Sequence, residues 1–216
     1  MCRAHGHPGM FTDRLWISAR HHVRFYPNAV TLSPGVTAAE TVAGRDTSGS
    51  YSVKDSFARL DLAGQGLEPL FEAEWIARLP GPAPATQDDL CWSAVTGDAE
   101  LARWETVWAQ GAAPDGRLFR PALLADPHCT VLACHREGSL VAGAIAYTSG
   151  PVTGISNVFG AGIDVDRLWA SVLPAGAALR PDLPLVGYER GADLAAARQA
   201  GCRVLGPLRV WARGLA

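Results

Sequence analysis

The order of apolar segments after residue 89 constrains the fold of this chain more than any other feature. Alternating and β-branched runs predict strands, and apolar residues spaced by three and four predict amphipathic helices. In chain order these are a strand (90–95), two helical pieces (98–110 and 118–124), three strands (129–135, 140–148 and 152–159), a helix from 164 or 166 to about 179, a strand (183–188), a helix (191–200) and a strand (204–211). This order predicts an α/β fold with a mixed sheet.

A proline-rich segment, LPGPAPATQDD at residues 79–89, precedes this half of the chain. Prolines at every second position interrupt both a regular helix and a central strand. We therefore expect a linker there. The predicted organisation is a flexible tail (1–10), an N-terminal α/β lobe rich in β structure (11–78), the linker (79–89) and a C-terminal domain (90–216).

The N-terminal half has weaker signals. Residues 11–33 are rich in β-branched and aromatic residues and predict strands, and the Gly, Thr and Ser residues of 34–50 predict a loop. Ser52 or Asp55 is a candidate cap for a short helix that carries Phe57, Leu60 and Leu62. The periodicity of 67–78 is compatible with a helix or a strand.

Composition excludes several classes of function. The net charge of −2 gives no electrostatic support to nucleic-acid binding. No run of about 18 apolar residues is present, so no membrane span is expected. Five cysteines without a C-x-x-C pair indicate free thiols and a cytoplasmic protein rather than a disulfide framework. No metal site is expected either, because His21, His22, His128 and Cys129 lack zinc-ligand spacing.

The segment from Asn157 to Gly162 leaves an apolar strand and enters a helix. Amide groups at a helix N-terminus point outward and can bind phosphate oxygens, and glycines let the backbone approach closely. This segment resembles the Q/R-x-x-G-x-G/A loop of the GNAT N-acetyltransferases, with Asn157 in place of Gln or Arg. The resemblance implies that acetyl-CoA or another acyl-CoA is the cofactor. Its pyrophosphate would lie on Asn157, Val158, Phe159, Gly160, Ala161 and Gly162. Asp164 and Asp166 depart from the pattern, because carboxylates would repel an anion.

Two further segments are similar to GNAT proteins, so that the resemblance covers about residues 88–213. The closing helix, Gly201 and last strand match, although Ala197 replaces the family's general-acid tyrosine and Cys202 replaces its aromatic residue. The strand LPLVGYE (183–189) corresponds to the strand that diverges from its neighbour and opens the acyl-thioester cleft.

Transfer of an acyl group to an amine needs a base for the ammonium proton and a donor for the oxyanion, and an acid can protonate the thiolate. Glu189 is the predicted base and Tyr188 the predicted acid, because both end the strand beside the cleft. His135 and Glu137 are alternatives. The competing interpretation places Tyr188 in the core and makes Glu189 a cap of the next helix. Ser156 is a candidate substrate or pantetheine contact.

Residues 66–78 and 201–213 both run from Gly to Ala-Arg, with a Trp near the end. This similarity hints at a degenerate GNAT-like repeat. In that arrangement a cationic substrate would contact Trp75 and the acidic residues of the first lobe, Glu74 among them.

The predicted function is therefore acyl-CoA-dependent N-acyl transfer to a small-molecule amine acceptor. A non-catalytic GNAT-like binding module and an acyl-carrier-dependent transferase remain alternatives. The apolar surface implied by seven tryptophans would allow a homodimer.

Overall fold

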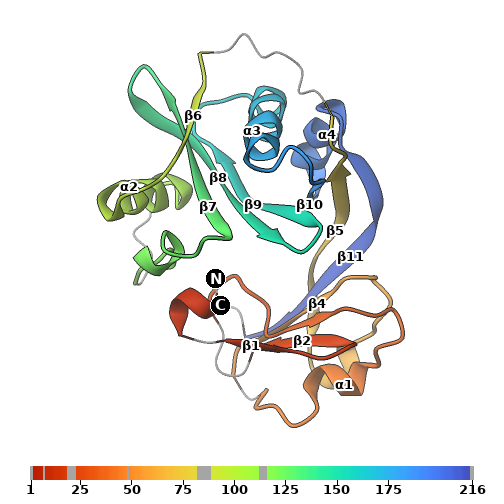
Figure 1. Cartoon of the computed structure of the whole chain (residues 1–216). Coiled ribbons are helices and arrows are strands. Elements are labelled where there is room, and N and C mark those ends of the chain that lie inside the picture. Colours follow the sequence, from red (N-terminus) through yellow and green to blue (C-terminus); the bar gives the residue numbers. More distant parts are fainter. Residues whose placement is uncertain are drawn as a thin grey trace. The chain divides into compact units, whose positions relative to one another are not determined.

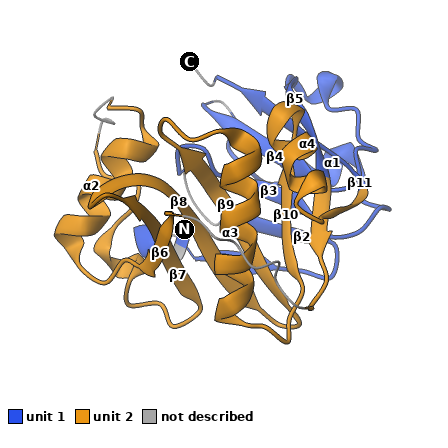
Figure 2. Ribbon diagram, turned by 90° about the horizontal axis from the view of Figure 1, so that it is seen from above, with its two compact units in different colours: residues 1–74, 206–216 blue, residues 75–205 orange. Residues whose placement is uncertain are grey.

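The computed structural model describes residues 2–6, 8–18, 23–47, 49–81, 89–111 and 116–214. The chain forms two compact units, one of Met1–Glu74 with Gly206–Ala216 and one of Trp75–Leu205 (Figure 2). Strands β5 (Glu68–Arg78) and β11 (Arg203–Arg213) contribute residues to both units. Within the described ranges no helix has the length and apolar character needed to cross a membrane.

The second unit is a mixed sheet with the strand order β5-β10-β9-β8-β7-β6 (Figure 1). Strands β6 to β9 are antiparallel neighbours, whereas β9 and β10 are parallel. The parallel pair requires a crossover, and helix α3 supplies it. The elements are β6 (Cys91–Ala94), α2 (Asp98–Trp108), β7 (Cys129–Arg136), β8 (Ser139–Ser149), β9 (Val152–Gly160), α3 (Val165–Leu179), β10 (Leu185–Glu189) and α4 (Gly191–Gln199).

The helices of this unit cover the sheet on both faces. On one face Trp169 and Leu173 of α3 and Ala196 of α4 pack against Ile155 and Leu185 of the sheet. On the other face aromatic side chains join α2 to the sheet, because the Trp104 ring lies 4.8 Å from Phe119 and 4.9 Å from Phe159. Successive strand residues point to opposite faces, so each sheet position can be assigned to one of these two layers.

The first unit has the strand order β1-β2-β3-β4-β11-β5, with helix α1 on one face. Tyr51 and Val53 of β4 pack with Trp211 of β11 and with Ala38 and Val42 of α1. A capping box, formed by Thr37 and Glu40, begins the helix. The elements are β1 (Gly9–Phe11), β2 (Leu15–Ser18), β3 (Ala29–Thr31), α1 (Ala38–Val42), β4 (Tyr51–Asp55) and short 3₁₀ turns at Cys2–His5 and Ala63–Gln65.

The two halves of the chain repeat the same element pattern. Each has an antiparallel three-strand meander, a crossover helix and a five-residue strand parallel to the strand before the helix (β3 and β4, β9 and β10). Each then ends in an 11-residue strand that begins two residues after a left-handed glycine, Gly66 or Gly201. The burial patterns of β5 and β11 coincide over their first seven residues. These shared features support a degenerate repeat.

The last strand of each half lies beside the five-residue strand of the other half. In the strand order β11 follows β4, and β5 follows β10. The sequence placed a boundary at 79–89, of which 82–88 lie outside the described residues. The compact units instead divide after Glu74 and after Leu205, because β5 and β11 each contribute residues to both units of one 11-stranded sheet.

Several predicted elements of the first half differ from the observed ones. Residues 34–50 were expected to be a loop but contain α1, and Tyr51–Asp55 is a strand rather than the start of a helix. Of the predicted tail, Cys2–His5 is a 3₁₀ turn and Gly9–Phe11 belongs to β1, whereas Met1 and His7 lie outside the described residues. Residues 67–78, ambiguous in sequence, form the strand β5. In the second half, the predicted helical piece at 118–124 is a single 3₁₀ turn, Pro121–Leu123.

Candidate functional site

Strands β9 and β10 are paired only at their beginnings (Figure 1). The amide of Thr153 donates to the carbonyl of Pro184 at 3.0 Å, and the register pairs are Leu185 with Thr153 and Val186 with Gly154. Both strands continue beyond this point, β9 to Gly160 and β10 to Glu189, without further register pairs between these described residues. The edge of β9 that faces β10 is therefore open after Ile155.

A β-bulge changes the direction of β9 at the same level. Gly143 of β8 pairs with Phe159 and Ile145 pairs with Ser156, so β9 carries one extra residue between these pairs. Asn157 lies there with φ of +53°, a left-handed conformation that Asn tolerates better than most residues. Bulges re-aim the side chains that follow them. Val158 accordingly packs toward α3 and Phe159 toward α2.

The bend after β9 leads into the N-terminus of α3. The amide of Ala161 donates to the carbonyl of Val141 at 2.7 Å. Gly162 has φ of +67° and open space around the position of a side chain. In the described part of the chain the amides of Gly162 and Ile163 have no acceptor, so they remain able to donate to a ligand.

Asp164 caps α3 and uses two further amides of this helix end. Its carboxylate accepts from the amides of Asp166, at 3.0 Å, and Arg167, at 3.2 Å. Arg167 forms an ion pair with Asp89. Gly162 and Ile163 thus offer two amide donors, while Asp164 and Asp166 place negative charge beside them. A negative charge at a helix N-terminus stabilises the helix but opposes a bound anion.

Tyr188 and Trp75 lie together on the face of the sheet opposite α3. Their ring centroids are 5.5 Å apart and their planes make an angle of 81°, an edge-to-face pair. Burial raises the pKa of the Tyr188 hydroxyl, and the neighbouring Glu189 carboxylate raises it further. Tyr188 therefore keeps its proton at neutral pH.

Glu189 points to the other face, where α4 begins. The pKa of its carboxyl is raised to about 8, chiefly by burial and also by the Asp193 carboxylate, while Arg190 opposes the rise. The indole nitrogen of Trp169 donates to the carboxylate of Asp193 at 2.9 Å, which holds that charge in the first turn of α4. A carboxyl group with a pKa near the working pH can both accept and release a proton.

The other predicted site residues are distributed around this region. Ser156 precedes the bulge, and its hydroxyl accepts from the Asn157 side-chain amide at 3.2 Å. Gly160 ends β9. Glu74 is the last residue that β5 contributes to the first unit, whereas Trp75 is in the second. The structure thus brings Trp75 to Tyr188, and it places Glu189 on the opposite face from both.

Sequence reasoning missed three residues of this region. Asp193 and Trp169 adjust the surroundings of Glu189 from two different helices, and no local pattern reveals that contact. Gly187 lets β10 approach the carbonyl of Ile155, because a Cβ atom there would lie 2.9 Å from that oxygen. A glycine inside a strand indicates close approach of a neighbouring backbone, so Gly187 was a signal for this contact in the sequence.

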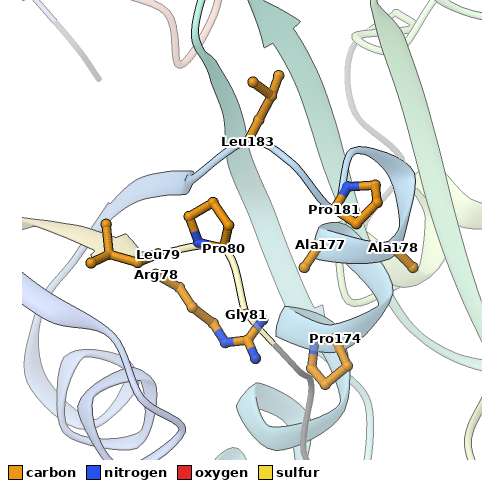
Figure 3. A pocket seen from close by; sticks show the side chains of 9 residues that line it. All are labelled: Arg78, Leu79, Pro80, Gly81, Pro174, Ala177, Ala178, Pro181 and Leu183. Carbon is orange, nitrogen blue, oxygen red and sulfur yellow. The ribbon is translucent and has the colours of Figure 1, made fainter.

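A separate small pocket lies at the other end of α3 (Figure 3). It has a volume of about 140 Å³ and mostly apolar walls, to which Pro174, Ala177 and Ala178 of α3 contribute. Arg78 of β5 extends toward this helix and supplies the only charged group among the described residues of the lining. A 15-residue helix is about 22 Å long, so this pocket is remote from the bend at Gly162.

No group of three potential metal-binding side chains occurs among the described residues. His21 and His22, considered above as ligands, lie outside them.

Solved structures share this architecture over three quarters of the chain or more. A GCN5-related N-acetyltransferase from Kribbella flavida is 15% identical, with a TM-score of 0.67 over 97% of this chain and 90% of that one. A conserved protein of unknown function from Staphylococcus epidermidis is 8% identical, with a TM-score of 0.68 over 96% and 94%. A tandem GNAT protein from the clavulanic acid biosynthesis pathway is 11% identical, with a TM-score of 0.50 over 76% and 63%.

The sequence matches no protein-family model and no curated protein. The resemblance inferred for residues 88–213 is nevertheless confirmed in three dimensions and extends into the first half. The chain has the fold of the GCN5-related N-acetyltransferases.

Proposed function

We propose that the chain is an acyl-CoA-dependent N-acyltransferase. It would transfer the acyl group of acetyl-CoA or another acyl-CoA to the amine of a small metabolite or amino-acid-like acceptor. The GNAT fold makes acyl transfer the expected chemistry, whereas the acceptor and the cofactor are part of the proposal.

The observation that carries the proposal is the separation of β9 from β10 beside the N-terminus of α3. Beyond the register pair of Val186 and Gly154, the open edge of β9 offers backbone N–H and C=O groups. An extended ligand with amide groups can pair with such an edge as an added strand. The amides of Gly162 and Ile163 lie at the end of this edge, where a diphosphate at the other end of the ligand would be bound.

The proton transfers are assigned to the end of β10. Glu189, with a pKa of about 8, is the base that removes the ammonium proton of the acceptor. Tyr188, which keeps its proton, is the acid for the departing thiolate. Trp75, which lies beside Tyr188 on the face opposite Glu189, is proposed with Ser156 and Glu74 as a contact of the acceptor's other groups rather than of its amine.

Isothermal titration with acetyl-CoA tests this proposal directly. Gly160→Asp should abolish binding, because it adds a carboxylate to the bend. Gly97→Asp controls for the added charge, because it places a carboxylate at the N-terminus of α2, where open space surrounds Gly97. A Cβ at Gly160 would lie 3.2 Å from Leu168 Cδ2, so the unfolding midpoint of Gly160→Asp is measured as well, and loss of binding at an unchanged midpoint is the expected result. Absence of heat and of thermal stabilisation with acetyl-, propionyl- and succinyl-CoA in the wild-type chain would contradict the proposal.

The Asp164 cap favours a second candidate, a GNAT-like module that binds a partner without catalysis. Its carboxylate occupies two amides that a pyrophosphate would use. This alternative predicts a specific protein partner and no thioester cleavage over a panel of amines. Transfer from an acyl carrier protein is distinguished by competition, because the carrier protein would then displace free coenzyme A.

A further inference from the structure

Strand β9 has two ways to continue along β8 beyond the pair of Ile145 and Ser156. A regular ladder would place Val158 opposite Gly143, whereas the observed partner of Gly143 is Phe159. A shift of one residue moves every following side chain to the other face of the sheet. A specific interaction therefore has to select the bulged register.

The two registers differ in the side chain that lies over Gly143. In the observed register Phe159 faces α2 and Val158 packs toward α3. In the regular register the two would exchange faces, so that Val158 would lie over Gly143 and Phe159 would point toward α3. The smaller side chain would then leave a void beside Gly143, and the phenyl ring would overfill the core that Val158 now occupies.

Trp104 of α2 favours the observed register through direct contact. A Cβ atom on Gly143 would lie 2.1 Å from Trp104 Nε1 and 2.5 Å from Phe159 Cε1, so both rings occupy the space that this glycine leaves. The ring centroids of Trp104 and Phe159 are 4.9 Å apart at an angle of 81°, an edge-to-face pair. This arrangement requires Phe159 to be the register partner of Gly143.

Trp104 is itself held in place by further contacts. Its side chain is fully buried, and its indole nitrogen donates to the Leu132 carbonyl of β7 at 2.8 Å. The Phe119 ring packs edge-to-face against it at 4.8 Å. The amides of Leu118 and Phe119 donate to the buried Glu105 carboxylate at 2.6 and 3.3 Å, which fixes this segment on α2. The indole ring therefore has a fixed position against which β9 packs.

The register of β9 determines the position of the bend that follows it. The amide of Ala161 donates to the Val141 carbonyl at 2.7 Å, immediately before the amides of Gly162 and Ile163. In the regular register this part of the chain would move by one residue along β8. Strand β9 would also lose the extra residue that turns it away from β10.

We propose that Trp104 is a positioning residue for the acyl-thioester slot. It acts through Phe159, whose ring it holds over Gly143, and so keeps β9 in the bulged register that opens the strand edge and places the bend. The inference rests on the proposed function only for the identity of the ligand in the slot. A change at Trp104 should therefore affect the bend before it affects the rest of the sheet.

Hydrogen exchange of two amides on either side of the bulge tests the inference without any ligand. The amide of Ala161 donates to β8 after the bulge, and the amide of Thr153 donates to the Pro184 carbonyl before it. In Trp104→Phe the Ala161 amide should exchange faster by at least about tenfold more than the Thr153 amide does. A purely structural role would change both exchange rates by one factor, and that result, or no change in either, would overturn the inference.

Two further variants complete the exchange experiment. Phe159→Leu, at a half-buried position, should give the same difference between the two amides, and it decides the question if Trp104→Phe does not fold. Trp211→Phe is the control, because it makes the same substitution at a buried tryptophan of the first unit. It should leave the ratio of the two exchange rates as in the wild type.

Calorimetry with acetyl-CoA, below the unfolding temperature of each variant, gives a second measurement. Trp104→Phe and Phe159→Leu should each weaken binding by at least about tenfold, since a small misplacement of a site costs affinity and rate. Trp211→Phe should bind as the wild type does. Wild-type affinity in both site variants would overturn the inference. A wild-type chain that does not bind acetyl-CoA would contradict the proposed function alone, because the exchange rates still decide the role of Trp104.

Discussion

Replacing Gly187 with alanine should destabilise the second unit by forcing β9 and β10 apart. The added Cβ would lie 2.9 Å from the carbonyl oxygen of Ile155 and 3.1 Å from its Cγ2. The first of these atoms belongs to the backbone of a paired strand and cannot rotate away. Inserting a methyl group into such packing typically costs about 1–3 kcal/mol, and we expect Gly187→Ala to fall in the upper half of this range.

Gly154, on the neighbouring strand β9, provides a matched control. A Cβ there would lie 3.5 Å from the Tyr147 carbonyl oxygen, an ordinary van der Waals contact. Gly154→Ala should therefore be neutral, or stabilising by a few tenths of a kcal/mol to about 1 kcal/mol through the unfolded state. Both variants have the same composition change, so their difference isolates the clash.

Guanidinium unfolding followed by tryptophan fluorescence measures this difference. The structure predicts a lower midpoint for Gly187→Ala at an unchanged slope, because the surface exposed on unfolding is the same. Weaker acetyl-CoA binding is also expected, since the slot is displaced. If Gly187→Ala and Gly154→Ala unfold at the same denaturant concentration, β10 does not approach Ile155 as described, and the argument for the slot loses its geometric basis.

Three further predictions concern the site and its support. Gly143→Ala should lower the free energy of unfolding by about 3 kcal/mol or more in the same assay. Its Cβ would lie 2.1 Å from Trp104 Nε1, which donates to the Leu132 carbonyl. A wild-type midpoint would refute this packing. Asp164→Ala should lose about 1 kcal/mol of stability, because it removes the cap of α3, and calorimetry should show tighter binding of acetyl-CoA. Asp164→Asn should keep the cap. Weaker binding by Asp164→Ala would contradict a phosphate site there. Glu189→Gln tests the raised pKa of this carboxyl. Between pH 4.5 and about pH 8 the folded wild type binds more protons than the unfolded chain. The stability of the wild type relative to the variant is therefore full at pH 4.5 and falls as the pH rises to 8. The shift corresponds to about 5 kcal/mol at most, and the remaining exposure of the side chain reduces the expected fall to roughly 2 kcal/mol; parallel pH profiles for the two chains would refute it.

The second half was largely predictable because its signals are local. The strands β7, β8 and β9 and the helix α3 have apolar patterns long enough to distinguish a period of two from a period of 3.6. Tyr188 and Glu189 could be placed at a strand end for the same reason. The bulge at Asn157 was not predicted, because one inserted residue changes the register without changing the local composition.

The first half was less predictable because its short elements depend on distant residues. Strand β4 has only five residues, and its neighbour β11 comes from the C-terminus. Residues Tyr51–Asp55 form a strand because β11 pairs with them, with Trp211 opposite Val53 and Arg209 opposite Asp55. Helix α1 is also five residues long, too short to form without the packing of Ala38 and Val42 on the sheet.

A comparison of the two parallel strand pairs explains why only one half carries a candidate site. In the first half Thr31 and Asp55 have side chains that reach across the strand ends, and their bonds to each other and to Ser56 hold the pair together. In the second half the strands are still close at Gly187, and Glu189 stands at the strand position of Asp55. Beyond it the bulge at Asn157 turns β9 away. One inserted residue in β9 therefore opens a slot at the level where the bonds of Thr31, Asp55 and Ser56 hold the corresponding strands of the first half together.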